Sequence, residues 1–248
     1  MSMLCVFGTI RNAGMSLTEK TNANLIKMYN YVCSCNDTVE YKDFQKMVRD
    51  NCDITESNVR MYSPFLYAHG FVKDYKNGTY KVSDFFTPLG TAYVKSLIVS
   101  SKIKNEVCRE KAMNITKDIL SLSLFERKII GQKDYYFDFL MFCDKYDSIS
   151  VKEFNYMLYE KEVLGNKDYV NSISETINQF RKGEIDYDFQ QKRTNKKGKK
   201  VMEPFPDNTF NYTRSLLVEA GLVIEADNGT YKINPDKARV ARILVEEV

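Results

Sequence analysis

The chain has 248 residues, of which 44% are hydrophobic and 28% are charged, and its formal net charge is +3. This composition is typical of a folded globular protein and excludes disorder throughout, and the length suits one large domain or two of ordinary size. So small a net charge does not establish a polyanionic partner, and local clusters of charge have to decide that question.

The start of the chain, MSMLCVFGTI, lacks the basic segment, long apolar run and cleavage site of a signal peptide. No apolar stretch approaches the roughly 18 residues that a membrane-spanning helix needs. The cysteines are scattered without the spacing of a disulfide framework or a zinc site, which indicates reduced thiols. We therefore expect a cytoplasmic protein with no membrane partner.

The first predicted elements are three helices and a hairpin. Apolar periodicity predicts one helix at 24–35, a second at 37–48 and a third that begins near residue 55 and stops at Gly70. Two strands follow, joined by an Asn-Gly turn at 77–78, because Asn-Gly is the strongest short signal for a two-residue hairpin turn.

The remaining predicted elements repeat this order. They are a strand end with a proline and a long helix (85–122), an apolar helix (135–146), a second helix (147–158), an insert with an amphipathic helix and a basic loop (about 160–205), a third helix with a glycine stop (210–221), a hairpin with Asn-Gly at its turn (228–229), and a short helix after Pro235.

Two stretches of the chain match each other at fixed offsets. Gly70 and Gly221 lie 151 residues apart, and AHGFVKDYKNGTYKV aligns there with EAGLVIEADNGTYKI without a gap. Asp37 and Asp147 lie 110 residues apart, in DTVEYKDFQKMV and DSISVKEFNYML. The difference between the offsets, 151 and 110, places 41 extra residues between the second and third helices of the second copy. Agreement of two registers in the correct order argues against chance.

Three helices followed by a two-stranded hairpin are the plan of a winged helix. The predicted fold is therefore mainly α with small β-wings (α+β), in which tandem winged-helix subdomains are joined by a helical linker. We expect a first winged-helix subdomain with an N-terminal strand or arm at 1–100, the linker at 101–132, and the second subdomain, with its insert, at 133–248.

The third helix of each copy is the candidate recognition helix. Its polar side chains are of the types that read base edges or hold phosphates, and acidic residues are absent from much of the face after Glu56 and Asp207. An ordinary solvated face is the alternative interpretation. Pro64 is expected to kink the first of these helices or to move its start. The candidate DNA-binding residues are Ser57, Asn58, Arg60, Ser63, Asn208, Thr209, Asn211, Tyr212 and Arg214.

The insert carries six positive charges within nine residues, at Lys192, Arg193, Lys196, Lys197, Lys199 and Lys200. A basic loop of this kind follows phosphates and adds affinity that depends on salt and ignores sequence. A disordered solubilising loop explains the charge equally well, but the two neighbouring winged helices favour DNA.

Signals for catalysis are sparse. The single histidine, His69, excludes sites that need two histidines within this chain, and we expect it to pack at a helix end. Tripeptides of the form acidic-x-Lys at 40–42, 74–76 and 126–128 do not fall on a buried sheet. We predict no catalytic residue, no metal ligand and no cofactor in this chain.

Taken together, the motifs resemble the N-terminal recognition part of type IIS restriction and nicking endonucleases, the BspD6I, AlwI, PleI and MlyI group, with FokI a more distant analogue. The resemblance covers nearly the whole chain and is most specific in its last block. Ala13 stands where many members have proline. The similar blocks are VFGTIRNA, HGFVKDYKNGTYKVSDFFTPLGTAYVKS, ISVKEFNYML, ISETINQFRKG and FNYTRSLLVEAGLVIEADNGTYKINPDK.

This resemblance implies a recognition domain that binds an asymmetric site in double-stranded DNA as a monomer, and it adds Arg11 and Asn12 to the DNA-binding candidates. It also implies a separate metal-dependent nuclease domain, using Mg2+, that would begin just after Val248. Cleavage by this chain alone is therefore not expected, although the parent protein would be a type II restriction endonuclease.

Two other functions fit the same residues. A tandem winged-helix transcription regulator or plasmid replication initiator would bind a palindromic or iterated site, usually as a dimer. A winged-helix scaffold for protein partners would bind no nucleic acid, since a fold does not fix a function.

Overall fold

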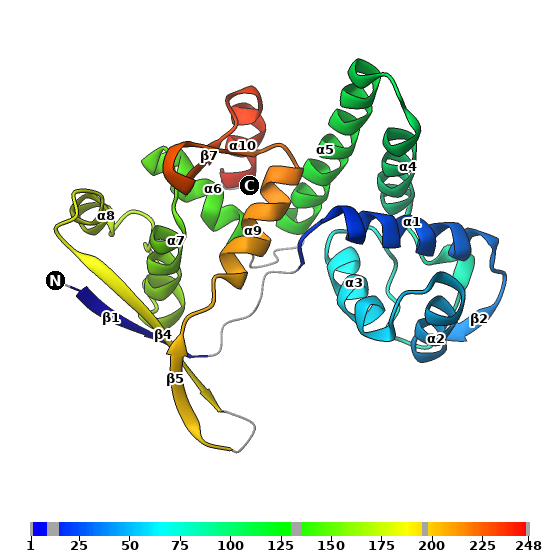
Figure 1. The fold of residues 1–248 in the computed structure, drawn as a ribbon, viewed down its shortest axis with the longest axis horizontal. Coiled ribbons are helices and arrows are strands. Elements are labelled where there is room, and N and C mark those ends of the chain that lie inside the picture. Colours follow the sequence, from blue (N-terminus) through cyan, green and yellow to red (C-terminus); the bar gives the residue numbers. More distant parts are fainter. Residues whose placement is uncertain (1, 9–14, 130–134, 195–197, 247–248) are drawn as a thin grey trace. The chain divides into compact units, whose positions relative to one another are not determined.

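The structure is a computed structural model that describes residues 2–8, 15–129, 135–194 and 198–246 (Figure 1). It is mostly helical with small sheets of two or three strands, and the chain therefore belongs to the general α+β class. The chain divides into two compact units, which we name after the sequence repeat. The first-copy unit comprises residues 15–133 and 215–222, and the second-copy unit comprises 1–14, 134–214 and 223–248.

Between residues 15 and 129 the structure has five helices and two short strands. In chain order these are α1 (Glu19–Ser34), β2 (Thr38–Glu40), α2 (Tyr41–Cys52), α3 (Glu56–Ala68), β3 (Thr79–Lys81), the 3-10 turn η1 (Val82–Asp84), α4 (Pro88–Lys102) and α5 (Glu106–Ile129).

The remaining elements form the second copy and its insertion. They are β1 (Ser2–Phe7), α6 (Tyr135–Tyr146), α7 (Val151–Leu158), the π-helical turn η2 (Tyr159–Val163), α8 (Ser174–Arg181), β4 (Asp186–Thr194), β5 (Lys200–Pro204), α9 (Asn208–Glu219), β6 (Val223–Glu225), η3 (Asp227–Gly229), β7 (Tyr231–Ile233), η4 (Pro235–Lys237) and α10 (Ala238–Val245).

Side-chain caps explain where several helices begin. The Thr55 hydroxyl accepts from the Asn58 N–H at 3.3 Å, and the Thr87 hydroxyl accepts from the Gly90 N–H at 3.0 Å. At α7, Ser150 and Glu153 form a reciprocal capping box. These contacts satisfy donors that the first helical turn leaves without partners.

The third helices of both copies end as the sequence predicts. Gly70 and Gly221 adopt φ angles of +68° and +70°, a region in which a residue without Cβ is favoured. The next residue then closes the turn: Phe71 N–H donates to the Leu66 carbonyl at 2.8 Å, and Leu222 N–H donates to the Leu217 carbonyl at 3.0 Å. The same backbone hydrogen bond therefore recurs at an offset of 151 residues.

Strand pairing repeats at both sequence offsets. Val39 pairs with Tyr80 between β2 and β3, and Ile149 forms a β-bridge with Tyr231 of β7. Ile149 lies 110 residues after Val39, and Tyr231 lies 151 residues after Tyr80. In each copy, the segment before the second helix therefore pairs with the strand after the Asn-Gly turn.

The two predicted hairpins have different outcomes. The second is formed by β6 and β7, and Asn228 and Gly229 at its turn have φ angles of +58° and +71°. The two-residue hairpin predicted for the first copy is not formed: β3 pairs with β2, and the segment before the turn pairs with the chain after β3 through an antiparallel bridge between Val72 and Phe86. Asp74 holds that loop instead: its carboxylate accepts from the Lys76 N–H at 3.0 Å, and local bonds of this kind compete with a strand ladder.

Aromatic residues fill the core of each copy. In the first, Phe44 lies 4.5 Å from Phe85 between ring centroids. In the second, Phe154 occupies the position equivalent to Phe44 and lies 5.5 Å from Phe210. These rings are buried, and burial of their large apolar area is the main force holding the small strands against the helices.

The expected helical linker at 101–132 is not a connecting helix. The helix is interrupted between α4 and α5, and α5 packs beside α4 within the first-copy unit (Figure 1). Asn105 explains the interruption, because its side-chain oxygen accepts from the Cys108 N–H at 3.0 Å and so caps the start of α5. Pro64, by contrast, does not interrupt α3, which runs continuously past it.

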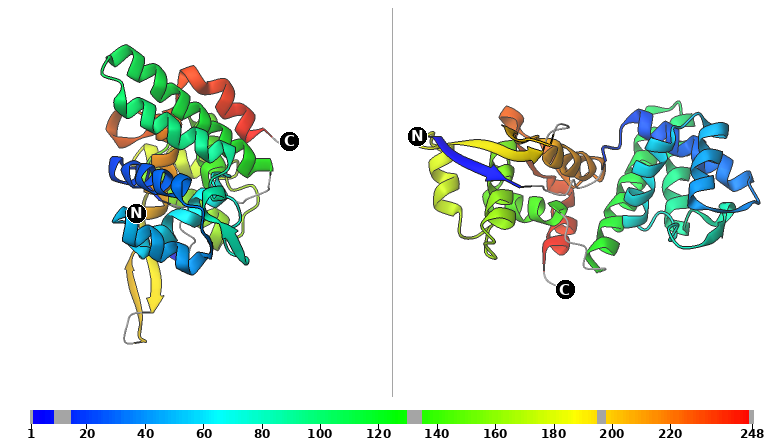
Figure 2. Two further views of the ribbon diagram at one scale, coloured as in Figure 1. Left: turned by 90° about the vertical axis from the view of Figure 1, so that its right-hand side faces the viewer. Right: turned by 90° about the horizontal axis from the view of Figure 1, so that it is seen from below.

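The N-terminal strand was expected in the first subdomain, but it belongs to the second-copy unit. β1 pairs in parallel with β4, which pairs antiparallel with β5 (Figures 1 and 2). Its inward side chains Cys5 and Phe7 are buried, and the Phe7 ring meets that of Tyr159 edge-on at 5.7 Å. Burial of this apolar face, rather than nearness in sequence, selects the partner strand.

Candidate nucleic-acid interface

Helix α3 has a solvent-exposed face opposite its buried side. Val59, Tyr62 and Leu66 are turned into the core, and a row of positions on the opposite side is exposed. The exposed positions are Ser57, Arg60, Met61, Pro64 and Tyr67. Ser57 and Arg60 are among the residues that the sequence analysis predicts to contact DNA, whereas Met61, Pro64 and Tyr67 are not.

Helix α9 has a corresponding face. Asn208 is exposed, and Asn211 and Tyr212 are partly exposed. At the offset of 151 residues they correspond to Ser57, Arg60 and Met61. We name these two sets of three residues the outward faces of α3 and α9. The repeat could have located Met61 before the structure, because its equivalent Tyr212 was a candidate.

Two predicted contact residues are wrong, because they lie on the inner side of their helices. Ser63 is fully buried, and its hydroxyl donates to the Val59 carbonyl at 2.9 Å. Thr209 is only 3% exposed. A serine or threonine in a helix can satisfy its hydroxyl on the preceding turn and so face the core, which residue type alone does not reveal.

Arg214 is half-buried and is engaged within its own unit. Its guanidinium donates to the Tyr231 hydroxyl at 2.5 Å and lies 5.0 Å from the centre of the Tyr231 ring. The side chain therefore ties α9 to β7 through a hydrogen bond and a cation–π contact. Asn58, another candidate, is also only partly exposed.

The acidic residues at the start of each third helix have partners. The Glu56 carboxylate forms an ion pair with the Arg49 guanidinium. The Asp207 carboxylate accepts from the Asn155 side-chain amide at 3.3 Å. Arg49 therefore offsets the negative charge of Glu56, whereas Asn155 gives Asp207 a hydrogen bond without an opposite charge.

The predicted basic loop is a β-hairpin in its described residues. β4 and β5 pair antiparallel, with Arg193 opposite Val201 and Thr194 opposite Lys200. We name this hairpin the β4–β5 arm, and it projects from the rest of its unit (Figures 1 and 2). Exposed cations lie toward the tip of the arm: Lys192 and Arg193 are on β4, Lys200 is on β5, and Lys199 directly precedes β5. Lys196 and Lys197 lie outside the described residues.

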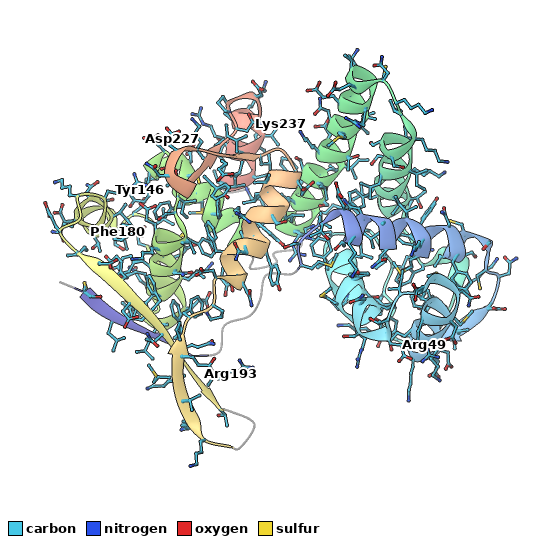
Figure 3. The ribbon with its side chains drawn as sticks, viewed as in Figure 1. Arg49, Tyr146, Phe180, Arg193, Asp227 and Lys237 are labelled. Carbon is cyan, nitrogen blue, oxygen red and sulfur yellow. The ribbon has the colours of Figure 1, made fainter. Side chains whose placement is uncertain are left out.

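The cations of the arm are accessible. The Arg193 side chain is 66% exposed and has a distant ion pair with Glu203 at 3.9 Å. Figure 3 shows it extending from the arm. Met202, on the same strand as Lys200, is 48% exposed. The long ion pair with Glu203 leaves most of the Arg193 side chain open to solvent.

The base of the arm is anchored by aromatic packing. Phe205 stacks on Phe7 with ring centroids 4.0 Å apart, and its N–H donates to the Phe189 carbonyl at 2.8 Å. Burial raises the pKa of the neighbouring Cys5 thiol to about 11, so this thiol is protonated at neutral pH and acts as packing. Because α9 begins at Asn208, only residues 205–207 separate the arm from this helix.

Other candidates remain unplaced. Arg11 and Asn12 lie outside the described residues. In the parts of the chain that the structure describes, no three His, Cys, Asp or Glu side chains gather where they could hold a metal ion. Likewise, none of the described helices has both the length and the apolar character needed to cross a membrane.

Comparisons of this chain with protein-family models, with curated proteins and with solved structures found no match.

Proposed function

We propose that this chain is a sequence-specific double-stranded DNA-binding protein built from two winged helices that bind one asymmetric site. The outward faces of α3 and α9 contact base edges in the major groove, and the β4–β5 arm contacts phosphates. We further propose that it acts as the recognition part of a type IIS-like restriction endonuclease, which is the role that the resemblance stated in the sequence analysis implies.

The observation that carries the proposal is the repeated strand pairing. Val39–Tyr80 and Ile149–Tyr231 join equivalent positions in the two copies. A strand before the second helix that pairs with the strand after the third helix is the arrangement expected of a winged helix. A duplication of this kind supplies two recognition helices in one polypeptide, which suits a site whose halves differ.

The distribution of charge supports a nucleic-acid partner over a protein partner. The outward faces carry polar groups and one arginine but no carboxylate. The arm adds exposed cations on two paired strands. Cations that neutralise phosphates provide affinity without sequence preference, whereas side chains on a helix in the major groove provide specificity.

Selection of bound duplexes from a random pool tests the function directly. The expected result is one asymmetric consensus, bound by a single chain as measured by sedimentation of the complex. A palindromic or iterated consensus bound by two chains would favour a transcription regulator or replication initiator instead. Enrichment of no sequence, together with affinity that does not change with salt, would refute DNA recognition.

A further inference from the structure

We infer that the two recognition helices read different bases at equivalent places: a guanine opposite Arg60 of α3 and an adenine opposite Asn211 of α9. This inference rests on the proposed function, because it requires both helices to enter the major groove. It goes further by naming two bases of the site and the side chain that selects each.

Arg60 and Asn211 occupy the same place in the two copies. They lie 151 residues apart, the offset that also relates Gly70 to Gly221 and Tyr80 to Tyr231. Each is in the first half of its helix, on the outward face. Two copies of one fold that bind a groove alike would bring these two side chains to corresponding base pairs.

Both side chains have their polar groups available. Within the described part of the chain, neither the Arg60 guanidinium nor the Asn211 amide has a hydrogen-bond or ion-pair partner. Arg214 differs in this respect, because its guanidinium is bonded to Tyr231. A side chain without internal partners can form two hydrogen bonds to a base without breaking any of its own.

The chemistry of the two side chains assigns the bases. An arginine guanidinium donates two parallel hydrogen bonds, which match the O6 and N7 acceptors of guanine in the major groove. An asparagine amide both donates and accepts, which matches the N7 acceptor and the N6 donor of adenine. Residues at spacings of three, four and seven along a helix are those that reach base edges in homeodomains, and Ser57, Arg60, Met61 and Pro64 have this spacing.

The test exchanges the two residues. Selection from the random pool is repeated on the full chain carrying Arg60→Asn and on the full chain carrying Asn211→Arg. We expect Arg60→Asn to change one consensus position from guanine to adenine, and Asn211→Arg to change a different position from adenine to guanine. At each exchanged position the preference should move by about tenfold or more, because a bidentate contact discriminates between bases to this extent.

Three further variants control for charge and folding. Arg109→Asn and Asn114→Arg make the same exchanges at exposed positions of α5 and should leave the consensus unchanged. Arg60→Lys keeps the charge but not the planar pair of donors, so it should weaken the guanine preference while retaining most of the affinity. Thermal unfolding of each variant verifies that it is folded.

The outcomes separate this inference from the proposed function. An asymmetric wild-type consensus that neither exchange alters would overturn the base assignment and leave DNA recognition intact. A change at the same position in both variants would also overturn it. If the wild-type protein enriches no sequence, the proposed function fails and the inference fails with it.

Discussion

Neutralising the β4–β5 arm should weaken binding to every duplex alike. The perturbation is the fourfold replacement of Lys192, Arg193, Lys199 and Lys200 by glutamine, which removes the charge and keeps a flexible polar side chain. These residues are exposed on an arm that projects from its unit, so their loss leaves the packing of the core unchanged.

The magnitude follows from counterion release. Each phosphate contact contributes about 0.9 to the slope of log K against log salt, so four contacts contribute about 3.6. Relative to a 1 M reference, this slope is worth about three powers of ten in affinity at 0.15 M salt, or about 4 kcal/mol. The weak ion pair of Arg193 with Glu203, at 3.9 Å, takes little from this value.

Fluorescence anisotropy at several salt concentrations measures the effect on a specific and on a random duplex. Both affinities should fall by a similar factor, and both slopes should flatten. The matched control replaces four exposed cations of the same unit outside the arm by glutamine, namely Lys167, Lys182, Arg239 and Arg242. Equal losses in the two variants would mean that only net charge matters, and a loss confined to the specific duplex would mean that the arm reads sequence; either result refutes the reasoning.

Three further predictions concern stability. Gly90→Ala should destabilise the protein by about 2 kcal/mol or more in urea unfolding, although alanine favours a helix, because a Cβ there would lie 1.9 Å from the Phe71 carbonyl oxygen; an increase in stability would contradict the packing. Burial, with the nearby Arg127 charge, lowers the pKa of His69 well below its usual value. The imidazole of His69 therefore binds a proton more tightly in the unfolded chain than in the folded one. The contribution of His69 to stability should be complete above pH about 6.5 and fall by up to about 1.4 kcal/mol per pH unit below it, and His69→Gln should lack this slope between pH 6.5 and 5.5. Arg214→Met should lower the unfolding free energy by about 1–2 kcal/mol by removing the contacts with Tyr231, without changing a single consensus base; a changed base would return Arg214 to the interface.

Helices α3 and α9 illustrate how far residue types can be interpreted without a structure. Apolar spacing identified both helices and their glycine stops, because a helix that packs on a core repeats its buried positions locally. It did not separate Arg60, which is exposed, from Ser63, which is buried and bonded to Val59. Which polar side chain faces the solvent depends on the surfaces that surround the helix.

The first hairpin shows a second limit. Asn77 and Gly78 favour a tight turn, yet β3 pairs with β2, and Val72 before the turn bridges Phe86 and not β3. Local propensity describes what a short segment can do alone, and here the hydrogen bond from the Lys76 N–H to the Asp74 carboxylate competes with the strand ladder. The basic stretch was likewise located correctly by its charge, but its hairpin geometry depends on pairing between β4 and β5.

The sequence by itself determined that the chain contains two copies of one order of elements, with 41 additional residues in the second. Repeats and periodicity can be recognised from the order of the residues alone. Only the tertiary structure decided that β1 pairs with β4, more than 180 residues further along the chain, and which members of the candidate set face solvent. Strand pairing and side-chain exposure depend on which apolar surfaces, distant in the sequence, are buried against each other. A short segment of the sequence does not contain this information.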